Sequence, residues 1–124
     1  MARRNRDICN LNDYFKEFVG IENLYKTTFG FNYTDGIKAL CSSFEPDLWW
    51  LVKVITSYQP QLFKEEFQQW KLYTVDGHLS ILICDNGNGE ELIRKEINVA
   101  DVAGNCTIWI EANIIFLPSE HLKK

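Results

Sequence analysis

The pattern of hydrophobic and polar positions divides the chain into a helical first half and a second half made of strands. Over residues 11–66, apolar side chains tend to recur every three or four positions, which is the spacing of one face of an amphipathic helix. Over residues 67–118 the spacing changes to two, which is the spacing of one face of a strand. Helices followed by strands, without alternation between the two, predict an α+β domain.

Three helices are predicted in the first half, over about 11–25, about 34–43 and about 46–58. Thr34 and Asp35 can cap the second helix, and Pro46 suits the first turn of the third because its missing N–H would have no partner there. The third helix is apolar on two faces, so we expect it to be buried against the sheet. Pro60 opens one further helical turn.

About five antiparallel strands are predicted in the second half, arranged as a meander with the helices packed on one face of the sheet. Asp76-Gly77 is a strong hairpin signal, and Ala112-Asn113 predicts another tight turn because asparagine tolerates a left-handed backbone. The pattern assigns no structure to residues 99–106. The expected strands are about 67–75, 79–84, 91–98, 107–111 and 114–117.

The sheet face turned away from the helices is the first candidate for a binding surface, because it mixes aromatic and charged side chains. The alternative is an ordinary solvated face. Trp49, which falls on the same side of its helix as Lys53 and Thr56, is the tryptophan most expected to be partly exposed. In one register the sheet face carries Lys71, Tyr73, Ser80, Arg94, Glu96, Thr107, Trp109 and Glu111.

Composition places the chain among folded domains. Its 124 residues are 46% hydrophobic and 14% aromatic, which is enough apolar surface for one domain over residues 1–124. Residues 1–10 are predicted to form a flexible basic arm. Residues 1–62 carry seven basic and seven acidic side chains, whereas residues 63–124 carry six and ten, so the formal charge of -4 belongs to the second half. Direct nucleic-acid binding is therefore disfavoured.

The sequence shows no membrane segment, and we expect a cytoplasmic protein of a bacterial cell. The longest uninterrupted apolar run is Leu48–Val52, far short of the roughly 20 residues that span a bilayer. Asp7, Asn10, Asn12 and Asp13 occupy the positions where a signal peptide needs apolar residues.

Candidate chemistry is sparse, and we expect no catalytic residues, metal or cofactor. The four cysteines are too far apart for a zinc or redox motif, which favours free core residues over disulfides. His78 and His121 are predicted to be exposed. The loop that begins at Asp85 has glycines where a calcium loop needs its second and third ligands. Cys84 has no base near it in the sequence.

Four short motifs, taken in order, resemble a known family. They are Tyr33-Thr34-Asp35-Gly36-Ile37, Trp49-Trp50-Leu51 with Ser57 and Gln59, Phe67 and Trp70 in a strand ending at Asp76, and Leu117-Pro118-Ser119-Glu120-His121. Together they look like a family of small uncharacterised bacterial and phage proteins, a domain of unknown function often carried on mobile elements. The resemblance covers residues 22–121. It implies a compact domain and a bacterial or phage context, but no activity.

The leading functional hypothesis is a non-enzymatic interaction protein of a phage or mobile element. It would inhibit a host defence complex, in the manner of an anti-CRISPR protein, by binding a protein partner through aromatic and acidic side chains. The candidate partner-binding residues are Trp49, Tyr73, Glu96, Trp109 and Glu111.

Two alternatives stay open. One is a small hydrolase or transferase that uses carboxylates such as Glu65-Glu66 and Glu90-Glu91, with or without a metal. The other concerns assembly, and is a homodimer that pairs the stripe of Trp50, Val54 and Tyr58 across a two-fold axis.

Overall fold

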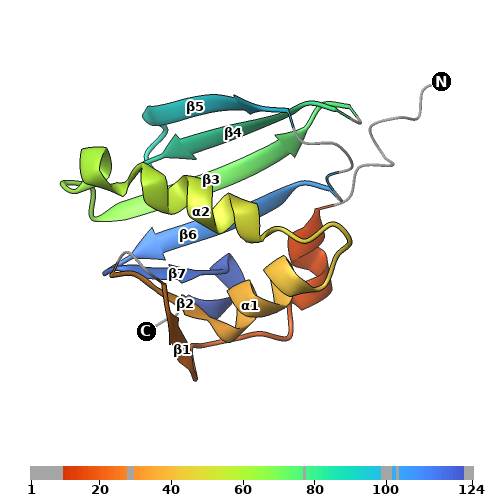
Figure 1. The fold of residues 1–124 in the computed structure, drawn as a ribbon. Helices are drawn as coiled ribbons and strands as arrows, with labels where there is room; N and C mark the ends of the chain where they lie inside the picture. Colours follow the sequence, from red (N-terminus) through yellow and green to blue (C-terminus); the bar gives the residue numbers. More distant parts are fainter. Residues whose placement is uncertain (1–9, 28–29, 77, 99–101, 103, 122–124) are drawn as a thin grey trace.

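One mixed sheet carries two helices on one face, as the computed structural model of residues 10–27, 30–76, 78–98, 102 and 104–121 shows (Figure 1). The strands of this described part are β1 (Leu24–Lys26), β2 (Asn32–Thr34), β3 (Phe67–Thr74), β4 (Ser80–Asp85), β5 (Glu91–Ile97), β6 (Cys106–Glu111) and β7 (Ile114–Phe116). The helices are α1 (Asp35–Ser42) and α2 (Trp49–Ser57), and the 3-10 turns are η2 (Leu11–Phe15), η3 (Gln59–Leu62) and η4 (Pro118–Glu120). The predicted α+β class is confirmed.

The order of the strands differs from the predicted meander of about five antiparallel strands. The seven strands run in the order β1-β2-β7-β6-β3-β4-β5, so only β3, β4 and β5 form a meander. β6 pairs with the other edge of β3 instead of with β5, and β2 runs parallel to β7. The physical reason lies in β5, where Lys95 faces the same side as its buried neighbour Leu82. A charge pointing to the helix side suits an edge strand and opposes further pairing.

The first predicted helix, over about 11–25, is wrong. The structure has the short turn η2 there, followed by an irregular stretch and by β1. Gly20 adopts a left-handed backbone with φ of 71°, which a continuing helix cannot accommodate. Leu11 and Phe15 are buried, whereas Val19, which a helix would bring to the same face as Phe15, is 68% exposed.

The second predicted helix is confirmed as α1, and the third begins later than expected. The Thr34 hydroxyl caps α1 by accepting from the Ile37 N–H at 3.3 Å. Pro46 lies ahead of α2 and not in its first turn, and the Asp47 carboxylate accepts from the Trp49 N–H at 3.1 Å. Pro60 opens η3, as the sequence predicts.

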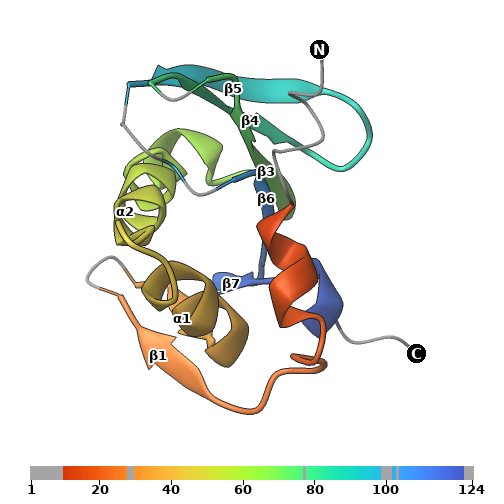
Figure 2. The same ribbon diagram turned by 90° about the vertical axis from the view of Figure 1, so that its right-hand side faces the viewer.

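The two faces of the sheet are covered differently. α1 and α2 lie on one face (Figure 2). η2 packs against α1 beside the start of β6, where Leu11 and Phe15 join the same core and the Leu11 N–H donates to the Asn105 C=O. Asn12 of η2 fixes this arrangement, because its side chain accepts from the Thr107 N–H at 2.7 Å and donates to the Thr107 C=O at 2.9 Å. Of the described elements, none covers the outer face of β3, β4 and β5 (Figure 2).

The core lies between the sheet and the two helices. Trp70 and Leu72 of β3 and Leu82 of β4 are each at most 1% exposed. The stripe considered for a two-fold interface is half-buried and packs against this core. It consists of Trp50, Val54 and Tyr58.

The end of the described chain caps α1 through the Glu120 clasp, which we define as Thr34, Gly36, Leu117 and Glu120. Glu120 is 1% exposed. Its carboxylate accepts from the Thr34 hydroxyl at 2.6 Å, from the Gly36 N–H at 3.0 Å and from the Leu117 N–H at 2.8 Å. Two motifs of the family resemblance are thus parts of one contact, at the positive end of a helix where a carboxylate is stabilised.

Candidate functional site

Two of the five predicted binding residues lie in one row across the outer part of the sheet. Tyr73 of β3 is opposite Ile81 of β4, which is opposite Glu96 of β5. Cross-strand neighbours point to the same face, and the alternate residues Trp70 and Leu72 are buried on the helix side. Tyr73 and Glu96 therefore share the face that α2 does not cover.

This region, which we call the uncovered sheet face, has an apolar middle between charged side chains. Tyr73 is 41% exposed. Arg94 donates to the Glu91 carboxylate at 2.9 Å and 3.0 Å, which holds the pKa of Glu91 below its usual range. The uncovered sheet face consists of Lys71, Tyr73, Ile81, Ile83, Arg94 and Glu96.

The predicted place of Ser80 on this face is wrong. Ser80 pairs with Thr74 and is 1% exposed on the helix side of the sheet. The prediction fails by a single residue of register, and such a shift moves a strand side chain to the opposite face.

Trp109 lies on the same face of the sheet, in the part beside η4, where it is held in place. Its indole Nε1 donates to Gln69 Oε1 at 3.0 Å. Its ring meets those of Phe67, Phe116 and His121 at centroid distances of 5.2, 6.2 and 5.6 Å. Trp109 is half-buried in this aromatic cluster and is less free to meet a partner than Tyr73.

Glu111 borders this cluster. It is exposed, lies opposite Phe67 across β6 and β3, and places its Oε1 3.3 Å from Nε2 of His121. Of the five predicted residues, the sheet register therefore brings four to one face: Tyr73, Glu96, Trp109 and Glu111.

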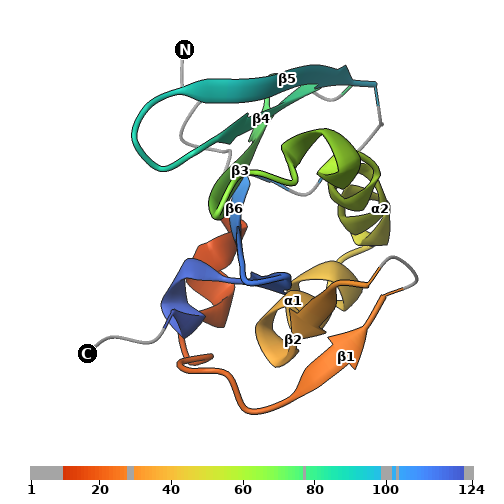
Figure 3. The ribbon, with the colours of Figure 1, turned by 90° about the vertical axis from the view of Figure 1, so that its left-hand side faces the viewer.

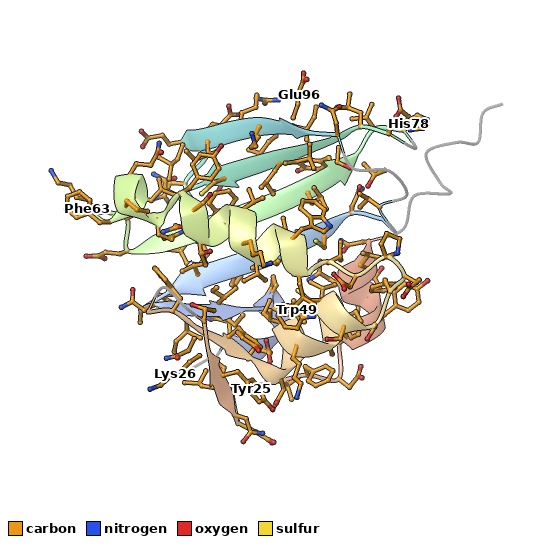
Figure 4. The ribbon with its side chains drawn as sticks, in the orientation of Figure 1. Tyr25, Lys26, Trp49, Phe63, His78 and Glu96 are labelled. Carbon is orange, nitrogen blue, oxygen red and sulfur yellow. The ribbon has the colours of Figure 1, made fainter. Side chains whose placement is uncertain are left out.

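Trp49 is the predicted residue that does not join them. It begins α2 on the helix side, half-buried, with its ring edge-to-face against Tyr33 at 5.2 Å (Figure 4). Tyr33 stacks in turn on Tyr25 at 5.3 Å. The Tyr25 hydroxyl donates to the Asp35 carboxylate at 2.7 Å and holds the pKa of Asp35 below its usual range.

The described cysteines are unsuited to thiol chemistry. Cys41, Cys84 and Cys106 are free and buried. Burial raises the pKa of the Cys84 and Cys106 thiols to about 12, and it also raises that of Cys41. A thiol with a raised pKa holds almost no reactive thiolate at neutral pH. Cys9 lies outside the described residues.

In a Cys9→Ser variant, we expect almost no reaction of native protein with a thiol reagent at pH 8. The raised pKa values keep the three remaining thiols protonated, and burial keeps the reagent away. In denaturant all three should react at the rate of free cysteine. The measurement is the absorbance of the released chromophore over time. Rapid labelling of native protein would show that one of these thiols is accessible.

The groups considered for metal binding do not assemble a metal site in the described part of the chain. Among the residues that the structure describes, no group of three or more His, Cys, Asp or Glu is arranged to hold a metal. Asp85 accepts instead from the Gly87 N–H at 2.8 Å and from Gln69 Nε2 at 3.1 Å. No described helix has the length and apolar character needed to cross a membrane.

A groove on the helix side is the feature that the sequence pattern missed. It has a volume of about 900 Å³ and lies between η3 and the turn that joins β6 to β7. Phe63, on its wall, is 77% exposed. One signal in the sequence pointed to it. Leu62 and Phe63 are adjacent in a helical turn, where neighbouring side chains point in different directions, so the two cannot both face the core.

Comparison with known proteins identifies a family for the chain but gives no activity. A family model described as a family of unknown function (DUF6876) matches residues 9–121. No curated protein and no solved structure matches the chain.

Proposed function

Because the chain belongs to a family of unknown function (DUF6876), its function has to be inferred from its own surfaces, and we propose that it is a non-enzymatic protein that binds a protein partner. The contact is made through the uncovered sheet face. The observation that carries this proposal is the exposure of Tyr73 on a face that no described element covers.

The chemistry of this face suits a protein partner. Tyr73 has Ile81 beside it, and Ile83 follows on the same face of β4. Arg94 and Glu96 lie along the outer strand. An apolar middle with a charged rim is the usual composition of a protein interface, and tyrosine is favoured among residues that carry binding energy.

The sharper form of the proposal concerns the partner. The family resemblance supports an origin in a phage or mobile element, and a protein carried there gains from inhibiting a host defence complex. The acidic excess of residues 63–124 supports a partner with a basic surface, because complementary charge accelerates and orients encounter.

We expect Tyr73→Ala and Glu96→Lys each to weaken retention of the partner, by about tenfold, which corresponds to about 1.4 kcal/mol of binding free energy. Tyr73→Ala removes an exposed aromatic anchor, and Glu96→Lys reverses a charge on the same row. Retention is measured by immobilising the protein, passing lysate of a bacterial host over it and titrating the identified partner.

Lys53→Ala is the matched control, because Lys53 is exposed on α2 and away from the sheet face. Equal retention by all variants would overturn the proposed face, and copurification of a small molecule without any protein would overturn the proposed function. The sharper form is tested by phage plating on cells that express the protein beside an active defence system. Unchanged plating across the tested systems would contradict it.

A further inference from the structure

The groove beside η3 combines apolar walls with a polar floor. Leu62 and Phe63 line it from one side and Ile110 from the sheet. In Figure 4, Phe63 points away from the body of the molecule. Figure 3 shows the turn after α2 leading into β3, which lies between β6 and β4 in the sheet. A large apolar side chain left exposed on the wall of such a hollow marks a binding site.

Two buried carboxamides form the floor. Gln59 and Gln68 are 7% and 3% exposed and both line the groove. Each donates to the other, from Gln59 Nε2 to Gln68 Oε1 at 2.9 Å and from Gln68 Nε2 to Gln59 Oε1 at 2.8 Å. Gln59 Nε2 also donates to the Ile55 C=O at 3.1 Å, and the Trp70 indole donates to Gln68 Oε1 at 2.9 Å.

This network leaves one donor and one acceptor unused. A carboxamide has two N–H donors and an oxygen that accepts two hydrogen bonds. The second N–H of Gln68 and the second acceptor site of Gln59 have no partner among the described residues. The two atoms that carry them are 2.8 Å apart. Both groups belong to residues that line the groove, so a ligand seated there can supply the missing hydrogen bonds.

We propose that this groove binds an extended peptide segment. An extended residue directs its own N–H and C=O to the same side, as in a β ladder. Its C=O would accept from Gln68 Nε2 while its N–H donates to Gln59 Oε1, and an adjacent apolar side chain packs against Phe63.

The charges at the groove select the flanking residues of the peptide. Lys64 is the one basic residue among its lining residues, against Glu65 and Glu66. The carboxylate of a third lining glutamate, Glu111, lies beside His121 on the other face of the sheet. The local excess of negative charge favours basic side chains beside the apolar anchor. None of the residues that form the uncovered sheet face lines the groove, so this inference stands independently of that face.

The test uses acetyl-Arg-Phe-Leu-Arg-amide as the probe, titrated into ¹⁵N-labelled full chain and followed by NMR. We expect saturable shifts of the side-chain amide signals of Gln59 and Gln68. A second probe with glutamate in place of both arginines should bind more weakly, by about fivefold, and a third with N-methylated Phe and Leu should bind about tenfold more weakly. Absence of shifts at the two glutamines would overturn the proposal, and so would equal binding of the N-methylated probe.

Variants of exposed residues separate binding from folding. Phe63→Ala should weaken the first probe by about tenfold, whereas Val19→Ala, at a residue 68% exposed and outside the groove lining, should leave it unchanged. Glu66→Lys, at an exposed position, should weaken the arginine probe and strengthen the glutamate probe. Equal affinities in all three variants would show that the peptide binds elsewhere and would overturn the proposal. Tighter binding of uridine than of every peptide would also overturn it, and would indicate that the two glutamines bind a nucleobase.

Discussion

Replacing Glu120 by alanine is expected to lower the free energy of unfolding by about 4 kcal/mol, because it leaves several buried donors without an acceptor. The carboxylate accepts from the Thr34 hydroxyl and from two backbone N–H groups, and Glu120 itself is 1% exposed. Alanine offers no acceptor, so the Gly36 and Leu117 N–H groups would stay buried without a partner. Glu120→Gln keeps one acceptor oxygen and should lose less.

The loss is measured by urea unfolding followed by circular dichroism. Glu22→Ala is the control, since Glu22 is an exposed glutamate, and substitutions at such positions usually change stability by less than about 0.5 kcal/mol. If Glu120→Ala were as stable as this control, the Glu120 clasp would make no contribution to the free energy of unfolding.

The second large effect is expected at Gly36. A Cβ at this position would stand 2.6 Å from the carboxylate carbon and one oxygen of Glu120. The carboxylate is held by three hydrogen bonds and cannot withdraw freely. We therefore expect Gly36→Ala to destabilise the protein by about 2–3 kcal/mol, in the upper part of the range for overpacking in a filled core.

The effect of Gly36→Ala on stability should change sign once the Glu120 side chain is removed. In a Glu120→Ala background the added methyl group meets no carboxylate, and alanine is preferred to glycine within a helix by about 0.5–1 kcal/mol. Gly36→Ala should then be neutral or stabilising. The four unfolding free energies form a double-mutant cycle whose interaction energy reports the contact. Strictly additive effects would show that the cost of Gly36→Ala arises elsewhere.

Local signals were sufficient for the elements whose partners lie nearby in the sequence. The cap at Thr34 and the strand pattern of β3, β4 and β5 depend on short spacings. The turn between β6 and β7 is also local, and both of its residues, Ala112 and Asn113, have positive φ values of 55° and 64°. The corresponding predictions are confirmed at the level of each element.

The pairing of strands that lie far apart in the sequence could not be predicted from the pattern of hydrophobic and polar positions. β2 is three residues long and its place beside β7 depends on a segment about eighty positions later, so nothing in its own residues distinguishes it from a loop. The position of β6 beside β3 depends in the same way on which edge of the β3-β4-β5 meander stays open.

The candidate site could be predicted only to the extent that side chains alternate between the two faces of a strand. Alternation placed Tyr73 and Glu96 on one face, and the same rule misplaced Ser80 because the register of a hairpin depends on its turn. The groove joins Phe31, η3 and the turn after β6, and a spacing rule carries no information about segments that meet only in the folded chain.

The Glu120 clasp also sets an order of events during synthesis. A ribosome delivers the chain from its N-terminus, and Glu120 emerges 84 residues after Gly36, whose N–H it accepts. Until then α1 lacks its buried acceptor, and β2 has β1 on one side but not yet β7 on the other. Contacts of such long sequence separation are slow to form, so β2 and α1 complete their packing only after translation has reached β7 and η4.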